Sequence, residues 1–284
     1  MQVPILFLLP MAFLLLPGTS AGEIIGGHEA EPHSRPYMAF LEIHRGEKSF
    51  RCGGFLVAED FVLTAAHCWG EEITVLLGAH DVSEEEDSQQ VIPVRRQIPH
   101  PEFNQKTLKN DIMLLQLTRR VKLTQAVGLL QLTSARRRRR PYPTCSVAGW
   151  GQTGLNVRTD VLQEADLVVV NDAFCQHRYL YYFPSSMLCV GDPEHDQSIF
   201  VGDSGGPLVC GGVAEGIVSK CIGSKISPPT VFTRISHFLP WIKANLPEQY
   251  RVDGRPPASA TPPAPGNAGS GLPLHLGPRP IIGL

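Results

Sequence analysis

Short apolar runs separated by turn-forming residues recur through most of this 284-residue chain. Gly, Pro, Asn and Asp interrupt residues 25–245, where long apolar patterns with a helical period are scarce. Repeated short strands between turn signals are typical of an antiparallel sandwich or barrel. All-β domains often reach about 200–250 residues as one unit, so we expect an all-β fold. The expected strands are 38–43, 54–57, 61–64, 73–77, 112–117, 146–148, 166–170, 207–209 and 213–218.

One helix is expected late in the chain, over residues 238–246. Its sequence is Phe-Leu-Pro-Trp-Ile-Lys-Ala-Asn-Leu. Proline is favoured in the first turn of a helix, where its missing N–H has no partner to lose. We therefore place Pro240 in that first turn.

The two ends of the chain differ from its middle. Residues 5–16 are apolar and small residues follow, which is typical of a secretory signal, so we assign 1–21 to a signal peptide. The run is shorter than the roughly 20 residues of a membrane span, and no later segment is long enough, so no transmembrane segment is expected. Residues 251–284 hold eight prolines and six glycines in 34 residues. That composition predicts a disordered tail over 247–284, with a Pro-rich ligand or a removable propeptide as the alternative.

The net charge of the chain argues against nucleic acid as a partner. With 25 Lys and Arg against 27 Asp and Glu, the formal net charge is −2, whereas nucleic-acid binders usually carry a basic surplus. One local exception is a run of five arginines, which is either a solvated surface loop or a dock for sulfated glycans. The run consists of Arg136, Arg137, Arg138, Arg139 and Arg140.

Seven cysteines in a secreted chain indicate disulfides. Spacing alone does not assign the pairs, and an odd count leaves at least one thiol over. Because the cysteine and histidine spacing of a zinc site is absent, we expect no structural metal, and no cofactor is expected either.

The strongest chemical signal is a serine in a glycine-rich hexapeptide, Gly-Asp-Ser-Gly-Gly-Pro, in which the serine is Ser204. Far upstream, His67 stands in Thr-Ala-Ala-His-Cys, directly before a cysteine that can anchor it. A serine hydroxyl becomes a good nucleophile when a positioned base takes its proton. The pattern therefore predicts covalent catalysis by Ser204 with His67 as the base.

Two further elements complete the predicted site. Asp111, at the head of an apolar strand, is the candidate carboxylate that holds the histidine tautomer. A lone Asp at that place is usually a turn residue, and only the order His, Asp, Ser favours a catalytic role. The backbone N–H groups of Gly202 and Ser204 are the candidate oxyanion hole, and glycine at 202 permits backbone angles closed to other residues.

With these motifs the chain resembles the chymotrypsin-like serine peptidases of leukocyte granules, which include granzymes, cathepsin G and chymases. The resemblance covers residues 24–246, and its finer motifs lean toward granzymes of the B and H kind. It rests on the catalytic segments and on Ile-Ile-Gly-Gly at 24–27, Pro-His-Ser-Arg-Pro-Tyr-Met at 32–38, Cys-Gly-Gly at 52–54, Asn-Asp-Ile at 110–112, Val-Ala-Gly-Trp-Gly at 147–151, Cys-Val-Gly-Asp-Pro-Glu at 189–194 and Ser-His-Phe-Leu-Pro-Trp at 236–241.

The resemblance implies two six-stranded barrels, divided near residue 133, with the triad in the cleft between them. It also implies the disulfides Cys52–Cys68, Cys145–Cys210 and Cys175–Cys189. Phe200 replaces one partner of the fourth bridge of digestive relatives, which leaves Cys221 as the odd thiol. Cys221 is then either buried and inert or paired with another molecule.

The resemblance implies activation by proteolysis. Residues 22–23 resemble the activation dipeptide of granule proteases, and its removal would leave Ile24 as the new N-terminus. The Ile24 ammonium is then expected to pair with Asp203 inside the protein and to hold the Gly202 turn in its active form.

The resemblance also implies an uncharged specificity pocket. In the family the base of the pocket lies six residues before the nucleophile, which is Ser198 here, and a serine there does not favour Lys or Arg. Thr230 stands where granzymes that prefer Asp carry a basic residue. With Ile199, these residues indicate cleavage after an apolar or aromatic residue. Ser219, Lys220 and Cys221 depart from the relatives, which usually show an aromatic residue and then glycine after this serine. Cys221 adds bulk at the pocket mouth, so the pocket is either narrowed toward smaller apolar side chains or impaired.

The leading prediction is a monomeric serine endopeptidase that is secreted or stored in granules, acts in immune defence or cytotoxicity, and has protein substrates and serpin-type inhibitors. The alternative is a catalytically weak or inert granule protein that binds glycans or microbial surfaces through the arginine run. The intact triad favours the enzyme.

Overall fold

The computed structural model describes residues 27–134, 144–154, 157–192, 203–220 and 228–248. Several sequence predictions lie outside these ranges. They concern the signal peptide, the activation dipeptide, nearly all of the tail, Ile24, the five arginines, Ser198, Ile199, Gly202 and Cys221. In the described part of the chain, no helix is both long and apolar enough to cross a membrane.

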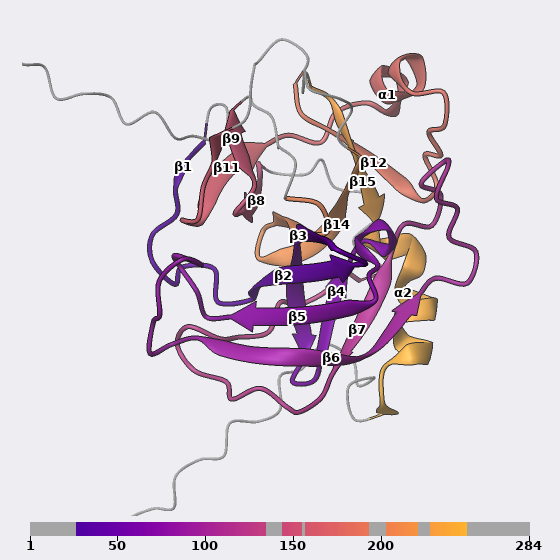
Figure 1. Ribbon diagram of the computed structural model, residues 1–284. Helices are drawn as coiled ribbons and strands as arrows, with labels where there is room; N and C mark the ends of the chain where they lie inside the picture. Colours follow the sequence, from indigo (N-terminus) through magenta and orange to yellow (C-terminus); the bar gives the residue numbers. More distant parts are fainter. Residues whose placement is uncertain (1–26, 135–143, 155–156, 193–202, 221–227, 249–284) are drawn as a thin grey trace, which may run out of the picture. The chain divides into compact units, whose positions relative to one another are not determined.

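A closed barrel of six antiparallel strands forms the first half of the fold, in the strand order β2-β3-β4-β7-β6-β5 (Figure 1). Alternation of side chains across the sheet fills its interior, as in β5, where Ile73, Val75 and Leu77 are buried. The strands are β2 (Met38–Arg45), β3 (Lys48–Ala58), β4 (Phe61–Thr64), β5 (Glu72–Leu77), β6 (Gln90–Pro99) and β7 (Met113–Leu117).

The second half is a seven-stranded sheet in the order β1-β11-β8-β13-β14-β15-β12. A separate two-stranded ribbon joins β9 (Gln152–Gly154) to β10 (Val157–Arg158). The strands of the large sheet are β1 (His28–Glu29), β8 (Cys145–Gly149), β11 (Gln163–Leu167), β12 (Met187–Val190), β13 (Pro207–Cys210), β14 (Val213–Lys220) and β15 (Thr230–Arg234).

This second sheet differs from the expected six-stranded barrel. The seventh strand is β1, from the N-terminal arm, which pairs with β11. At the opposite edge, β12 meets the segment just after β11 through an isolated bridge between Val169 and Val190. The Val170 N–H also donates to the Cys189 carbonyl at 2.9 Å. The sheet thus curls back on itself through a few bonds instead of a full ladder.

The chain passes between the two halves at residues 131–132. The Leu130 N–H donates to Leu56 of β3, whereas the Thr133 N–H donates to Ala214 of β14, each at 2.9–3.0 Å. The three expected disulfides are present, pairing Cys52 with Cys68, Cys145 with Cys210, and Cys175 with Cys189.

Two helices occur in the described residues, α1 (Asp172–Arg178) and α2 (Ile235–Asn245). The α2 helix starts three residues earlier than expected, because β15 runs directly into it. Pro240 is therefore inside the helix, and its placement in the first turn was wrong. Proline in a helix interior costs about 3 kcal/mol, and burial of Phe238 and Ile242 in the core of the first barrel offsets that cost.

Candidate active site

His67 lies on a single 3₁₀ turn, Ala66–Cys68, that follows β4. The turn is anchored on both sides of the histidine, since Ala66 is buried in the barrel core and Cys68 is bonded to Cys52 of β3. The His67 side chain is 24% exposed. The ring is thus held at the barrel surface and remains open to a reactant.

Asp111 is fully buried, two residues before the start of β7. Its Oδ2 lies 2.7 Å from Nδ1 of His67, and its Oδ1 accepts the His67 backbone N–H at 2.9 Å. From the second sheet, the Ser219 hydroxyl donates to Oδ2 at 2.6 Å, and the Thr233 hydroxyl donates to the Asp111 carbonyl at 2.7 Å. Hydrogen bonds from both halves of the fold therefore hold this carboxylate.

This arrangement sets the protonation of the imidazole. A carboxylate only accepts hydrogen bonds, so the neutral His67 ring carries its proton on Nδ1 and leaves Nε2 as the base. Burial acts to lower the pKa of His67, but the charge of Asp111 and its hydrogen bond outweigh burial, and the result is a raised pKa. The charge of Arg45 opposes that rise.

Ser204 lies on a turn that both halves of the fold hold. The Gly53 N–H of β3 donates to the Ser204 carbonyl at 2.8 Å, and the Gly205 N–H donates to Val218 of β14 at 2.8 Å. Because Gly53 follows Cys52, one hydrogen bond and one disulfide connect the Ser204 turn to the His67 turn. The structure thereby brings together the segments of all three predicted catalytic residues.

Gly205 is required where it stands. Its φ is +85°, and a Cβ there would lie 2.1 Å from the Thr64 hydroxyl and 2.4 Å from the Gly53 carbonyl oxygen. The Thr64 hydroxyl in turn donates to that carbonyl at 2.8 Å. A side chain at 205 would separate the Ser204 turn from β3.

Asp203 is 2% exposed and accepts the Gly151 N–H on Oδ1 at 3.0 Å. A Cβ at Gly149 or Gly151 would lie 2.2 or 2.5 Å from the same oxygen. The Gly-Trp-Gly segment therefore leaves space for a buried carboxylate beside the Ser204 turn. The sequence shows these glycines, but it gives no reason for them until the fold brings Asp203 near.

Of the predicted pocket residues, two have described side chains. The buried Ser219 commits its hydroxyl to Asp111, so its side chain orients the carboxylate. Thr230 is buried at the start of β15 and donates to the Val190 carbonyl at 3.3 Å. Lys220 ends β14, and its side chain lies outside the described part.

Thr233, Gly53 and Asn110 were not predicted as site residues. Asn110 has a φ of 59°, in the left-handed region that Asn tolerates, and leads the chain into Asp111. The Asn-Asp pair was the only local signal for it. Thr233 and Gly53 act on residues more than 100 positions away, so no local pattern identifies them.

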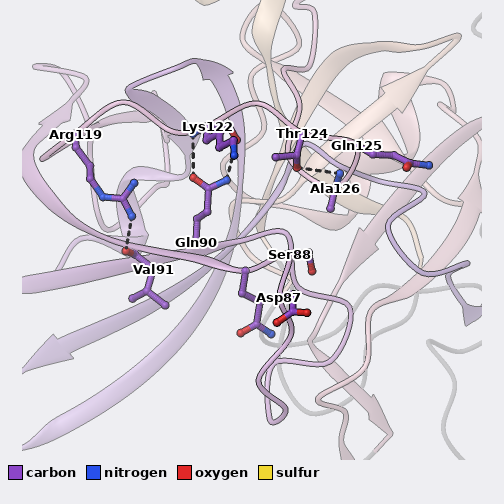
Figure 2. A pocket seen from close by; sticks show the side chains of 10 residues that line it. Asp87, Ser88, Gln90, Val91, Arg119, Lys122, Thr124, Gln125 and Ala126 are labelled. Carbon is purple, nitrogen blue, oxygen red and sulfur yellow. Dashed lines mark hydrogen bonds between the residues drawn. The ribbon is translucent and has the colours of Figure 1, made fainter.

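Two other features of the described residues, a cluster of possible metal ligands and a surface hollow, are separate from the predicted catalytic chemistry. The sulfurs of Cys52 and Cys68 lie near the His67 ring but are joined in a disulfide, so they are not thiolate ligands. A hollow of about 650 Å³ includes none of the predicted catalytic residues in its lining. In this hollow the Gln90 side-chain amide donates to the Lys122 carbonyl at 2.8 Å and accepts from the Lys122 N–H at 2.9 Å (Figure 2). These polar groups therefore already have hydrogen-bond partners.

Comparisons with known proteins agree with this geometry. The family profile described as Trypsin matches residues 24–242. Sheep mast cell protease 3 is 55% identical over 253 residues, covering 88% of this chain and 99% of its own, and human granzyme B is 55% identical over 245 residues, covering 86% and 98%. Human cathepsin G is 53% identical over 239 residues, covering 84% and 93%. A solved structure titled "Structure of GrC" is 46% identical, covers 78% of this chain and 98% of its own, and has a TM-score of 0.74.

The chain belongs to the trypsin family. It is a serine endopeptidase of the granule group, as the motifs predicted, and its substrates are proteins or peptides. The relatives give no support to an inert glycan-binding protein.

Replacement of Gly205 by alanine tests the contact between the Ser204 turn and β3. We expect the rate of Ser204 labelling by a fluorophosphonate to fall at least about 100-fold, since small displacements of reacting groups are costly. Gly212→Ala is the matched control, because its φ is also positive at +79° but a Cβ there meets nothing within 4 Å. The control should lose about 1–2 kcal/mol of stability and keep its labelling rate. Equal labelling rates in the two variants would contradict this account.

The raised pKa of His67 predicts the pH dependence. The imidazole must be neutral to accept a proton, so kcat/KM should fall as the pH drops through a midpoint above about 6.5, the ordinary histidine value. Asp111→Asn removes the group that raises this pKa, so its midpoint should move to lower pH. Its kcat should fall about 10⁴-fold, the magnitude established for this replacement in other members of the family. A profile that stays flat down to about pH 4 would exclude His67 as the base.

Proposed function

We propose that Ser204 is the nucleophile, His67 the general base and Asp111 the residue that orients the imidazole. The hydrogen bond of 2.7 Å between Asp111 and Nδ1 of His67 carries this proposal, because it directs Nε2 toward proton transfer. The Ser204 oxygen attacks the peptide carbonyl carbon while its proton passes to Nε2. His67 then gives the proton to the leaving amine as the C–N bond breaks, and water releases the acyl group by the reverse sequence.

The oxyanion hole is assigned to the backbone N–H groups of Gly202 and Ser204. Hydrogen bonds on both sides of Ser204 support this assignment, because they fix the turn before any substrate binds. Such fixed donors stabilise the negative oxygen of the tetrahedral intermediate, and each is typically worth about 100- to 1000-fold in rate.

We assign residues 1–21 to a signal peptide and residues 22–23 to an activation dipeptide. Activation is the removal of both, which leaves the catalytic domain, residues 24–246, followed by the tail, residues 247–284. The Ile24 ammonium then pairs with Asp203. The position of Asp203, buried directly beside Ser204, supports this role. Breaking a buried ion pair costs about 3–5 kcal/mol, enough to couple the new N-terminus to the shape of the oxyanion turn.

One labelling experiment tests both assignments. Protein that begins at Ile24 should react with a fluorophosphonate probe and cleave peptides, whereas Ser204→Ala should do neither. Protein that retains Glu23 cannot form the pair, so it should fold with a lower thermal stability and label slowly. If Ser204→Ala labels as the parent does, the nucleophile is misassigned. If the Glu23-retaining protein is fully active, the Ile24–Asp203 pair is not the switch.

The specificity assigned to the enzyme is cleavage after uncharged residues, with smaller apolar side chains favoured. Thr230 is a neutral side chain at the start of β15, and Ser198 and Ile199 add no charge to the pocket. We assign a narrowed pocket mouth to Lys220, which ends β14, and to Cys221, which follows it in the sequence.

Thr230→Arg should add cleavage after Asp and Glu, because it introduces a positive charge where the pocket has none. A peptide-library cleavage profile of the processed protein measures the change. Thr230→Val, of nearly the same volume and without charge, is the control and should keep the parent's preference. An unchanged profile in Thr230→Arg would remove residue 230 from the pocket.

Partners and location complete the proposal. Serpin-type inhibitors follow from the mechanism, since they use a bait peptide that the enzyme begins to cleave. We assign the protein to secretion or to storage in granules, and we expect it to be a monomer. The run from Arg136 to Arg140 is assigned to binding of sulfated glycans.

A further inference from the structure

Arg45, at the end of β2, reaches the turn that carries His67. Its Nη2 donates to the His67 carbonyl at 2.7 Å, and its Nε donates to the carbonyl of Trp69. The Glu71 N–H donates back to His44 of β2 at 2.8 Å. The segment from His67 to Glu71 is therefore held along the end of β2, and Arg45 supplies two of these three hydrogen bonds, to the carbonyls of His67 and Trp69.

The guanidinium itself is held in place by two aromatic rings. Its central carbon lies 5.1 Å from the ring centre of Phe50 and 6.0 Å from that of Trp69, distances at which a cation is attracted to an aromatic ring. Phe50 is 40% and Trp69 49% exposed, so the guanidinium lies against these two rings at the surface of the protein.

Arg45 is also a charge without a counterion among the described residues, since its hydrogen bonds there go to two backbone carbonyls. Two charged groups act on the imidazole, Asp111, which lies just before β7, and Arg45, at the end of β2. Asp111 raises the pKa of His67 and Arg45 lowers it. Glu71 is the nearest carboxylate on the turn's own segment, and it accepts the Gly46 N–H of the β2–β3 hairpin at 3.1 Å.

We propose that Arg45 is a positioning residue that fixes the His67 turn through two carbonyl bonds and acts as a fixed positive charge opposing Asp111. The inference rests on the proposed role of His67 as base. Lysine cannot replace the arginine in both respects, because only the planar guanidinium presents several donors in a fixed fork. The charge and the geometry can therefore be separated by substitution.

Three variants test the proposal. Arg45→Met should lower kcat about 3- to 30-fold and move the acid limb of kcat/KM to higher pH. Arg45→Lys keeps the charge but loses one of the two bonds, so kcat should fall while the midpoint stays at the parent's value. Arg119→Met is the control, because Arg119 also donates to a carbonyl, that of Val91 at 3.3 Å, yet touches no part of the site. The control should leave both values unchanged.

An NMR titration of the His67 ring separates this proposal from the catalytic assignment. In a Ser204→Ala background, which cannot turn over substrate, the titration midpoint of His67 should rise in Arg45→Met and stay in Arg45→Lys. Peaks are assigned with His67→Gln, and thermal unfolding verifies that each variant is folded. An unchanged midpoint in folded Arg45→Met would overturn the proposal. A parent enzyme that neither labels nor cleaves would instead overturn the proposed function, and the titration would still decide the role of Arg45.

Discussion

One buried carboxylate organises this molecule. Asp111 has no exposed surface, and an ion in such a place is tolerated only when hydrogen bonds replace the lost water. Here the imidazole and backbone of His67 come from the first barrel, and the hydroxyl of Ser219 comes from the second sheet. The Asp111 carboxylate thus has all of these hydrogen bonds only when the first barrel and the second sheet are packed together. The position of Asp111 against His67 therefore depends on that packing.

Ser204, the proposed nucleophile, depends on the same boundary between the two halves of the fold. Its turn is bonded to Gly53 on one side and to Val218 on the other, and glycine at 205 permits the approach to β3. Arg45 is a further contact to the His67 turn, where its guanidinium donates to the His67 carbonyl and adds a positive charge. Geometry and electrostatics at the imidazole are therefore set by residues from β2, β3, the entry to β7, and β14.

The sequence predicts more of the chemistry than of the topology. His67 and Ser204 stand in informative local motifs, and β4 has its predicted bounds. By contrast β6, with Pro93 and the two exposed charges of Arg95 and Arg96, shows no local strand pattern and is ordered by pairing with both β5 and β7. The α2 helix was misplaced because the start of the helix has no side-chain cap to signal it. Gly53 and Thr233 could not be found, since each acts on a residue that only the tertiary fold brings near.

The central claim is that Asp111 and Nδ1 of His67 share a hydrogen bond in the folded protein. The proton in that bond gives a far-downfield ¹H NMR signal when it is protected from solvent. We predict one such signal across the pH range of activity, moving further downfield as the imidazole becomes charged and disappearing in Asp111→Asn. A folded protein that lacks the signal, or an Asp111→Asn spectrum identical to the parent's, would contradict the account.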